Sequence, residues 1–340
     1  MRNRYFVFKS SYVFILLFIV SCCILQGCGS NSEKKGAEVD VTEAGAEVPI
    51  FDSDSAWSFI KSQVEFGYRI PGSEAHEACG DYLVTELKRM GLIVTEQRDR
   101  VEAFDGSLLP MRNIVGSYAP ERGKRILLCA HWDSRPWADN DADVRNHHTP
   151  VLGANDGASG VGALLEVARL LQIHGHPNVG IDIIFFDVED YGAPQFQTVY
   201  DGGWCLGSEY WGRNPHVEGY HARFGILLDM VGGKEATFFQ EGFSREYAPS
   251  VVDKVWDAAG RLGYASFFPK ENGGYVTDDH LPVNRLARIP CIDIIPMLPH
   301  CVESGFGPTW HTVNDNMEHM DKGTLRAVGQ TVLEVIYNEK

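Results

Sequence analysis

The sequence is short of positive charge. Its 30 lysines and arginines are outnumbered by 46 aspartates and glutamates, which gives a formal net charge of −16 at pH 7. The charge becomes −19 if residues 1–28 are removed, because that segment carries three basic residues and no acidic ones. So acidic a surface argues against nucleic acid as a partner.

Cysteine is also sparse and shows no metal-binding spacing. Three of the eight cysteines lie in the first 28 residues, which leaves Cys79, Cys129, Cys205, Cys291 and Cys301. An odd number in an exported protein leaves at least one thiol unpaired. Cys129 and Cys291 lie in apolar runs, where cysteine is commonly buried as a small apolar residue. The pattern excludes a cysteine zinc cluster and a cysteine nucleophile with a neighbouring base.

The N-terminus carries an apolar stretch, Tyr12 to Leu25, that is too short for a comfortable membrane span. It follows a basic start and precedes Gly27 and Cys28, an order typical of a bacterial secretion signal of the lipoprotein kind. An ordinary signal peptide cut nearby is the alternative, since Gln26 fits a lipid-attachment box imperfectly. We expect residues 1–28 to be the leader of an exported, periplasmic protein that meets the membrane only through a lipid anchor at Cys28.

Residues 29–50 are small and charged, with almost no large apolar side chains. Such a segment cannot bury enough surface to fold, which predicts a flexible acidic linker. No internal repeat or low-complexity tract follows it. Strand and helix patterns alternate evenly over residues 51–340, which predicts one domain of the α/β class. Its sheet should be mixed but mostly parallel, with helices on both faces.

Hydrophobic periodicity locates the expected elements. Helices are expected near 54–66, 74–90, 159–174, from about 206, 246–262, 279–287 and 323–338. Strands are expected near 93–102, 112–118, 125–130, 181–187, 224–231 and 291–296. The continuous Ile and Phe run at 181–187 is typical of a central strand covered on both faces.

Acidic and histidine residues recur where the buried runs end or the next segment begins. The strings are His131-Trp132-Asp133, Asn155-Asp156-Gly157, Glu189-Asp190, Leu228-Asp229 and Trp310-His311. Ligands bind outside the carboxyl ends of the strands in an open α/β sheet, so we expect these side chains to converge. Two or three carboxylates with a histidine at one rim predict a zinc site.

Single members of this set have simpler interpretations. Asp156 precedes an apolar helical pattern and could be a helix N-cap, because its oxygen can accept free backbone N–H groups. Adjacent Glu189 and Asp190 are harder to explain that way. Two neighbouring acids on a buried rim repel each other unless a cation or a shared proton offsets the charge.

The order of these strings resembles the zinc aminopeptidase fold and its relatives, the animal-type glutaminyl-peptide cyclotransferases. The resemblance spans residues 52–338, and three further strings favour the cyclotransferases. They are Thr277-Asp278-Asp279-His280-Leu281-Pro282, Cys291-Ile292-Asp293-Ile294-Ile295-Pro296, and the segment from Phe306 to Asn316 that contains Trp310-His311-Thr312. An Asp-Asp-His-x-Pro string and a Trp directly before the metal-binding His recur in that family.

The resemblance implies a site with one zinc ion per chain, held by Asp156, Asp190 and His311. Two carboxylates, one imidazole and an open position are the composition of a catalytic zinc site. Asp190 departs from the family, because many relatives carry Glu there, and the shorter side chain must bring its strand end closer to the metal. Glu189 is implied to lie beside the metal as general base and acid.

Three further acids are implied to surround the reaction. Asp229 and Asp278 match acids that share a proton in a hydrogen-bond network, which requires at least one raised pKa. Asp293 stands where animal enzymes carry His, and it is either a third member of this network or a buried acid paired with a basic residue.

Aromatic residues are implied to line the pocket. Trp310 and Phe306 are expected to contact the substrate side chain. Trp204 and Tyr191, in the loop after Glu189-Asp190, are assigned either to the outer rim or to core packing.

The resemblance implies an acyltransferase that cyclises N-terminal glutaminyl residues of peptides and proteins to pyroglutamate with release of ammonia. We expect it to act as a monomer. A zinc aminopeptidase of the same fold is the alternative, since His131, backed by Asp133, could bind a second metal together with Asp229. From another class, a catalytically silent protein could bind peptide N-termini. Such a binder has no need for Glu189.

Overall fold

The computed structural model describes residues 47–175, 178–197 and 202–340. The chain divides into two units, Met1–Ala44 and Gly45–Lys340. The predicted leader, Cys28 and most of the predicted linker lie outside the described residues. In the described part, no helix combines the length and apolarity needed to cross a membrane.

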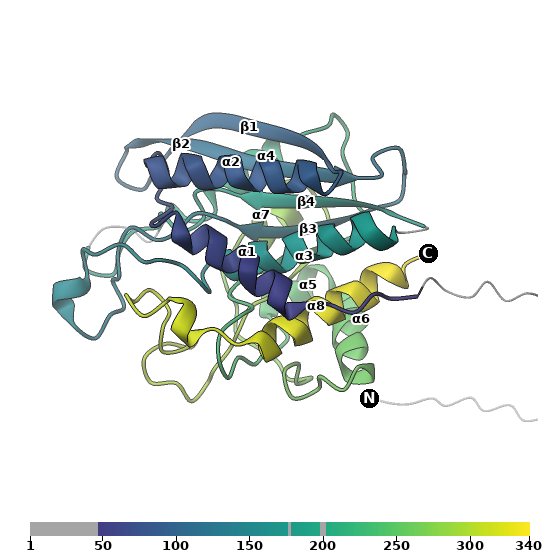
Figure 1. Ribbon diagram of the computed structural model, residues 1–340. Coiled ribbons are helices and arrows are strands. Elements are labelled where there is room, and N and C mark those ends of the chain that lie inside the picture. Colours follow the sequence, from purple (N-terminus) through teal and green to yellow (C-terminus); the bar gives the residue numbers. More distant parts are fainter. Residues whose placement is uncertain (1–46, 176–177, 198–201) are drawn as a thin grey trace, which may run out of the picture. The chain divides into compact units, whose positions relative to one another are not determined.

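The second unit is built on a sheet of six strands in the order β1-β2-β4-β3-β5-β6 (Figure 1). The strands are β1 (Ile93–Glu102), β2 (Leu108–Tyr118), β3 (Arg125–His131), β4 (Gly180–Phe186), β5 (Gly225–Leu228) and β6 (Cys291–Ile294). β3 pairs in parallel with β4 and β5, and β5 pairs in parallel with β6. β1 and β2 are antiparallel, and β2 is antiparallel to β4. The predicted mixed, mostly parallel sheet is confirmed, and β4 is buried along its whole length.

Helices cover both faces of the sheet. They are α1 (Ser53–Glu65), α2 (Glu74–Arg89), α3 (Ala158–His174), α4 (Leu206–Arg213), α5 (Gly242–Tyr247), α6 (Pro249–Arg261), α7 (His280–Arg285) and α8 (Lys322–Tyr337). Side chains from α1, α2, α3, α6 and α8 belong to one buried cluster, whereas α4 and α7 contribute to another on the opposite face.

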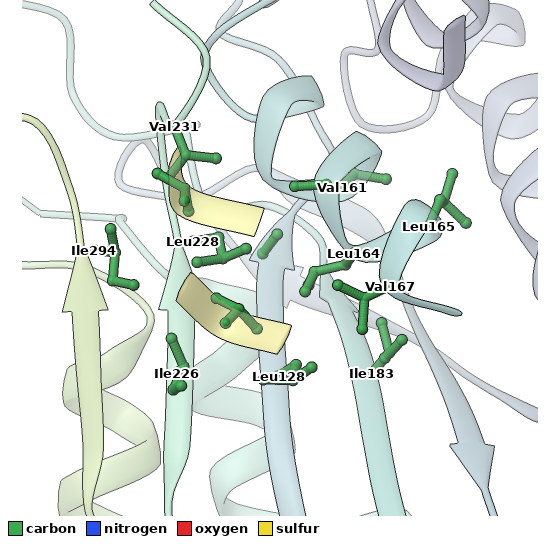
Figure 2. Packing of buried hydrophobic residues seen from close by; sticks show 14 of the residues in the cluster. Leu128, Val161, Leu164, Leu165, Val167, Ile183, Ile226, Leu228, Val231 and Ile294 are labelled. Atoms are coloured by element: carbon green, nitrogen blue, oxygen red, sulfur yellow. The ribbon is translucent and has the colours of Figure 1, made fainter. Parts of the chain in front are cut away.

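The alternation of side chains along β3 and β5 explains the two cores. Leu128 and Ile226 belong to the larger cluster, whereas Leu127 and Leu227 belong to the smaller one. Successive residues of a strand point to opposite faces, so an unbroken apolar run is needed when both faces are covered. Figure 2 shows the larger cluster, in which Leu164 of α3 packs over the strands.

One expected helix is divided in two, and the strands expected at 224–231 and 291–296 both end early. The helix expected at 246–262 is two helices, because α5 ends at Tyr247 and α6 begins at Pro249. Proline disfavours the helical conformation in the residue before it, and Ala248 has φ −138° and ψ 47°. The strand expected at 224–231 ends at Leu228, and Met230 has a φ of 50°. Asp229 is therefore the first residue beyond the strand.

Candidate active site at the strand ends

The predicted site residues converge on one cavity of about 480 Å³. Eight of the nine line it: Asp156, Glu189, Asp190, Asp229, Asp278, Phe306, Trp310 and His311. The ninth, Asp293, is fully buried in β6 and does not line the cavity. The sheet explains the convergence. Glu189 and Asp190 follow β4, Asp229 follows β5, and both strands run parallel to β3, which lies between them. Their carboxyl ends therefore meet at the same edge of the sheet.

Asp156, Asp190 and His311 form a donor set that suits a zinc ion. Each offers a ligand atom within 4.8 Å of the other two. Nε2 of His311 lies 3.3 Å from Oδ1 of Asp190 and 3.7 Å from Oδ2 of Asp156. Oδ2 of Asp190 is buried without a hydrogen-bond partner, as expected of an oxygen that binds a metal ion. The shorter side chain of Asp190 therefore still reaches the group.

Arg135 and Asp139 support this donor set from behind, although no motif in the sequence pointed to them. Oδ1 of Asp139 lies 3.4 Å from Nδ1 of His311, the arrangement that orients a metal-binding imidazole. Arg135 donates to both carboxylate oxygens of Asp139 at 2.7 Å and to Oδ1 of Asp190 at 3.2 Å. Burial opposes ionisation of Asp139, yet the hydrogen bonds from Arg135 and the proximity of His311 hold its pKa well below the usual range. Both residues lie in a loop without apolar periodicity, so no pattern could have found them.

The loop before α3 presents Asp156 as a cavity residue and not as a cap. The N-cap of α3 is Gly157, which makes no side-chain cap bond, so the N-cap interpretation of Asp156 is wrong. A Cβ at position 157 would lie 2.5 Å from Nε2 of His131, which is too close for any residue but glycine. Asp315 accepts from the backbone N–H groups of Asn155 and Asp156 at 2.7 and 3.0 Å. Burial and the charge of Asp156 raise the pKa of Asp315 to about 7.

His131 adds a second donor set that shares Asp156 with the first. Its Nε2 lies 3.0 Å from Oδ1 of Asp156 and 3.2 Å from Oδ1 of Asp229. Asp133 lies behind it, with Oδ1 3.3 Å from Nδ1 of the ring. Burial alone would lower the pKa of His131, but its hydrogen bonds to the three aspartates raise it well above the ordinary value.

Asp133 also ties this strand end to the next one. Its two carboxylate oxygens accept the backbone N–H groups of Glu189 and Asp190 at 3.2 and 3.1 Å. The position of both acids after β4 is thus set by a residue that follows β3.

Glu189 lies beside both donor sets in a buried, acidic environment. Its Oε1 accepts from Sγ of Cys205 at 3.4 Å, and its Oε2 lies 4.0 Å from Nδ1 of His131. Burial raises the pKa of Glu189 well above the usual range, and the charges of Asp190 and Asp278 raise it further. A carboxyl group with a raised pKa can hold and return a proton near neutral pH.

Asp229, Asp278 and Asp293 form the expected group of acids with raised pKa values. Burial, with the charge of a neighbouring aspartate, raises the pKa of Asp229 to about 6 and that of Asp278 to about 7. Burial and the charges of Asp278 and Asp229 raise the pKa of Asp293 well above the usual range. Ligand atoms of Asp278, His280 and Asp293 lie within 4.8 Å of one another. Asp293 therefore lies both in the acidic group and beside a basic residue.

His280 is held in turn by Glu241, a pair that the sequence did not reveal. Nε2 of His280 lies 3.2 Å from Oε2 of Glu241, and Nδ1 lies 3.8 Å from Oδ2 of Asp293. Glu241 also caps α5 by accepting from the backbone N–H groups of Phe243 and Ser244. Burial opposes its ionisation, but the adjacent His280 and the backbone donors lower the pKa of Glu241 to about 2.

The aromatic rings of Trp204, Tyr275, Phe306 and Trp310 line the cavity. Trp310 stacks on His311 with ring centroids 3.7 Å apart, and Phe306 packs against Trp310 at 5.1 Å. Trp204 lines the same cavity, parallel to the ring of His311 at 6.0 Å, so it belongs to the rim. Tyr191 packs instead against Trp137 at 5.1 Å, as its core interpretation predicted.

The chain is similar to proteins of known family and structure. Residues 113–336 match the model of peptidase family M28. A solved glutaminyl cyclase from Bacteroides thetaiotaomicron is 62% identical, covering 86% of this chain and 100% of that one, with a TM-score of 0.84. A structure from B. thetaiotaomicron described as a leucine aminopeptidase precursor is 61% identical, covering 87% and 100%, with a TM-score of 0.84. The glutaminyl-peptide cyclotransferase of Bos taurus is 26% identical over 293 residues, 76% of this chain and 74% of that protein.

Proposed function

Because the chain belongs to peptidase family M28 and is 62% identical to a solved glutaminyl cyclase over 86% of its length, we propose that it is a glutaminyl-peptide cyclotransferase. Its reaction converts N-terminal glutaminyl residues of peptides and proteins to pyroglutamate and releases ammonia. The observation that carries the proposal is the position of Glu189, a buried acid of raised pKa between the zinc donor set and Asp278.

The reaction needs one group that moves a proton from the nucleophile to the leaving group. The substrate α-amine attacks the γ-amide carbon, the new C–N bond closes the ring, and the old C–N bond breaks to release ammonia. Glu189 accepts the proton that the attacking amine loses and donates it to the leaving nitrogen. Glu189 thus ends the reaction in the protonation state in which it began, and no water is consumed.

The remaining site residues bind and orient the substrate. Zinc held by Asp156, Asp190 and His311 would polarise the γ-carbonyl oxygen and stabilise the negative charge that develops there. Asp229 and Asp278 accept hydrogen bonds from the reacting nitrogens, and their raised pKa values let them share a proton. Trp310 and Phe306 pack against the glutamine side chain.

We propose a single zinc ion per chain. The second donor set of His131, Asp156 and Asp229 is the observation that favours an aminopeptidase, in which a second metal helps to activate water. Cyclisation consumes no water, so a second metal offers the cyclase no advantage. Elemental analysis together with an assay of ammonia and free amino acids separates the two functions.

We further propose that the enzyme is exported and acts as a monomer held to a membrane by a lipid at Cys28. The support lies in the basic start, the short apolar stretch and the Gly27-Cys28 pair that follows it. Exported peptides and proteins with N-terminal glutamine are then its substrates.

A further inference from the structure

A smaller cavity of about 140 Å³ adjoins the active-site cavity. The two share Trp204, Glu209 and Thr277. The other walls of the smaller cavity come from α4, α7 and their flanking residues: Cys205, Arg213, Leu281, Pro282, Arg285 and Leu286. The two cavities therefore lie next to each other, which brings the smaller one within reach of a substrate in the main cavity.

The smaller cavity lies on the side of the acids that handle the proton. Thr277 directly precedes Asp278, and Cys205 donates its thiol hydrogen bond to Glu189. A third cavity, lined by Arg135, Asp139 and His311 among others, lies instead on the side of the zinc donor set.

The proposed reaction indicates which of these two neighbouring cavities the rest of the peptide approaches. The γ-carbonyl oxygen faces the zinc donor set, so the α-amine faces Glu189 and Asp278. The α-carbon that bears this amine also bears the carbonyl group that leads to the next residue. The peptide therefore leaves the main cavity on the Glu189 side, toward the smaller cavity.

The smaller cavity carries one positive charge that no neighbouring acid offsets. Nη1 of Arg213 pairs with Oε2 of Glu209 at 3.0 Å. Among the described residues, no carboxylate lies within 4.0 Å of the Arg285 guanidinium. Arg285 is held in place nonetheless, because its Nε donates to Oη of Tyr247 at 3.1 Å and its guanidinium lies 5.2 Å from the ring centroid of Phe243. A cationic side chain already held by aromatic rings loses little conformational entropy when it binds a carboxylate.

We propose that this cavity is a subsite for the residue that follows the N-terminal glutamine, and that Arg285 makes it selective for a carboxylate side chain, Glu or Asp. The inference rests on the proposed cyclisation and names the substrate class that the enzyme prefers.

The test compares three tripeptides with a free N-terminus and an amidated C-terminus, Gln-Glu-Ala-amide, Gln-Gln-Ala-amide and Gln-Lys-Ala-amide. Glu and Gln at the second position have nearly the same shape and differ in charge, and Lys carries the opposite charge. For an exposed charge pair we expect kcat/KM to favour Glu over Gln by about three- to five-fold, through KM, with Lys the poorest. The preference should shrink as salt is raised. Arg285→Gln should abolish it, and Arg285→Glu should reverse it toward Lys.

Arg261 supplies the matched control, because it is an exposed arginine on α6 that lines neither cavity. Arg261→Gln should keep the wild-type ratio. Equal kcat/KM for the three peptides, or a Glu preference that survives in Arg285→Gln, would overturn the subsite. Absence of ammonia from all three peptides would refute the proposed function instead, so the two failures are distinguishable.

Discussion

Oδ1 of Asp139 lies 3.4 Å from Nδ1 of His311, while Nε2 of the same ring faces Asp190 at 3.3 Å. The imidazole is thus fixed from behind by a carboxylate that Arg135 holds with two hydrogen bonds. A zinc ligand fixed in this way has a defined tautomer and ring orientation, so the brace should be measurable in the affinity of the site for metal.

Replacing the brace should weaken zinc binding without unfolding the chain. We expect Asp139→Asn to lower zinc affinity by about 10- to 100-fold, the usual effect of removing a carboxylate behind a metal-binding histidine. Competition against a chelator measures the affinity, and addition of excess zinc should restore part of the activity. Asp143→Asn, at an acid outside the site, is the control and should bind as the wild type does. Equal zinc affinity in both variants would show that Asp139 does not support zinc binding through His311.

Glu189→Gln should separate proton transfer from metal binding. The amide keeps the size of the side chain but cannot accept the proton, so we expect a loss of about two to four orders of magnitude in kcat. Zinc content and the thermal unfolding temperature should stay near the wild-type values. Turnover within a few fold of wild type would show that another group carries the proton.

Glu241 should contribute stability that depends on pH. Its pKa in the folded chain is lowered from 4.5 to about 2, so the contribution is complete above the unfolded value and is lost as pH falls through the folded one. The difference in unfolding free energy between wild type and Glu241→Gln should approach about 3 kcal/mol near pH 7 and shrink between about pH 4.5 and pH 2.

Urea unfolding at several pH values between about 3.5 and 7 tests this. The control is Glu65→Gln, at an exposed glutamate paired only with Lys61, and it should show a small difference at every pH. A Glu241→Gln difference that does not change with pH would contradict the assignment of the Glu241–His280 pair.

The leader proposed for residues 1–28 predicts a lipid-anchored protein. Cys28→Ala should release the protein to the soluble fraction or block its maturation. Several acyl chains are expected on Cys28, because one chain gives only marginal membrane binding. Mass spectrometry of the mature N-terminus measures this directly, and an unmodified start beyond Cys28 would rule out the anchor.

The sequence predicted what depends on strand periodicity and missed what depends on distant polar pairs. Asp190 and Asp229 follow recognisable buried strands, and parallel strands bring their carboxyl ends together, so the convergence could be foreseen. Arg285 lies in a short helix, and nothing in its local sequence shows that Tyr247 and Phe243 hold it. Pro249 marks the break between α5 and α6. The helical spacing of apolar residues continues beyond it, however, and so predicts one helix where the structure has two.

In the proposed reaction the substrate's own amine displaces ammonia, and a single assay on a glutaminyl peptide tests this. We predict ammonia in equal amount to the pyroglutamyl product, a peptide that keeps all its residues, and one zinc ion per chain. Free glutamine, cleavage of leucyl or alanyl peptides and two zinc ions per chain would contradict it and establish the aminopeptidase instead.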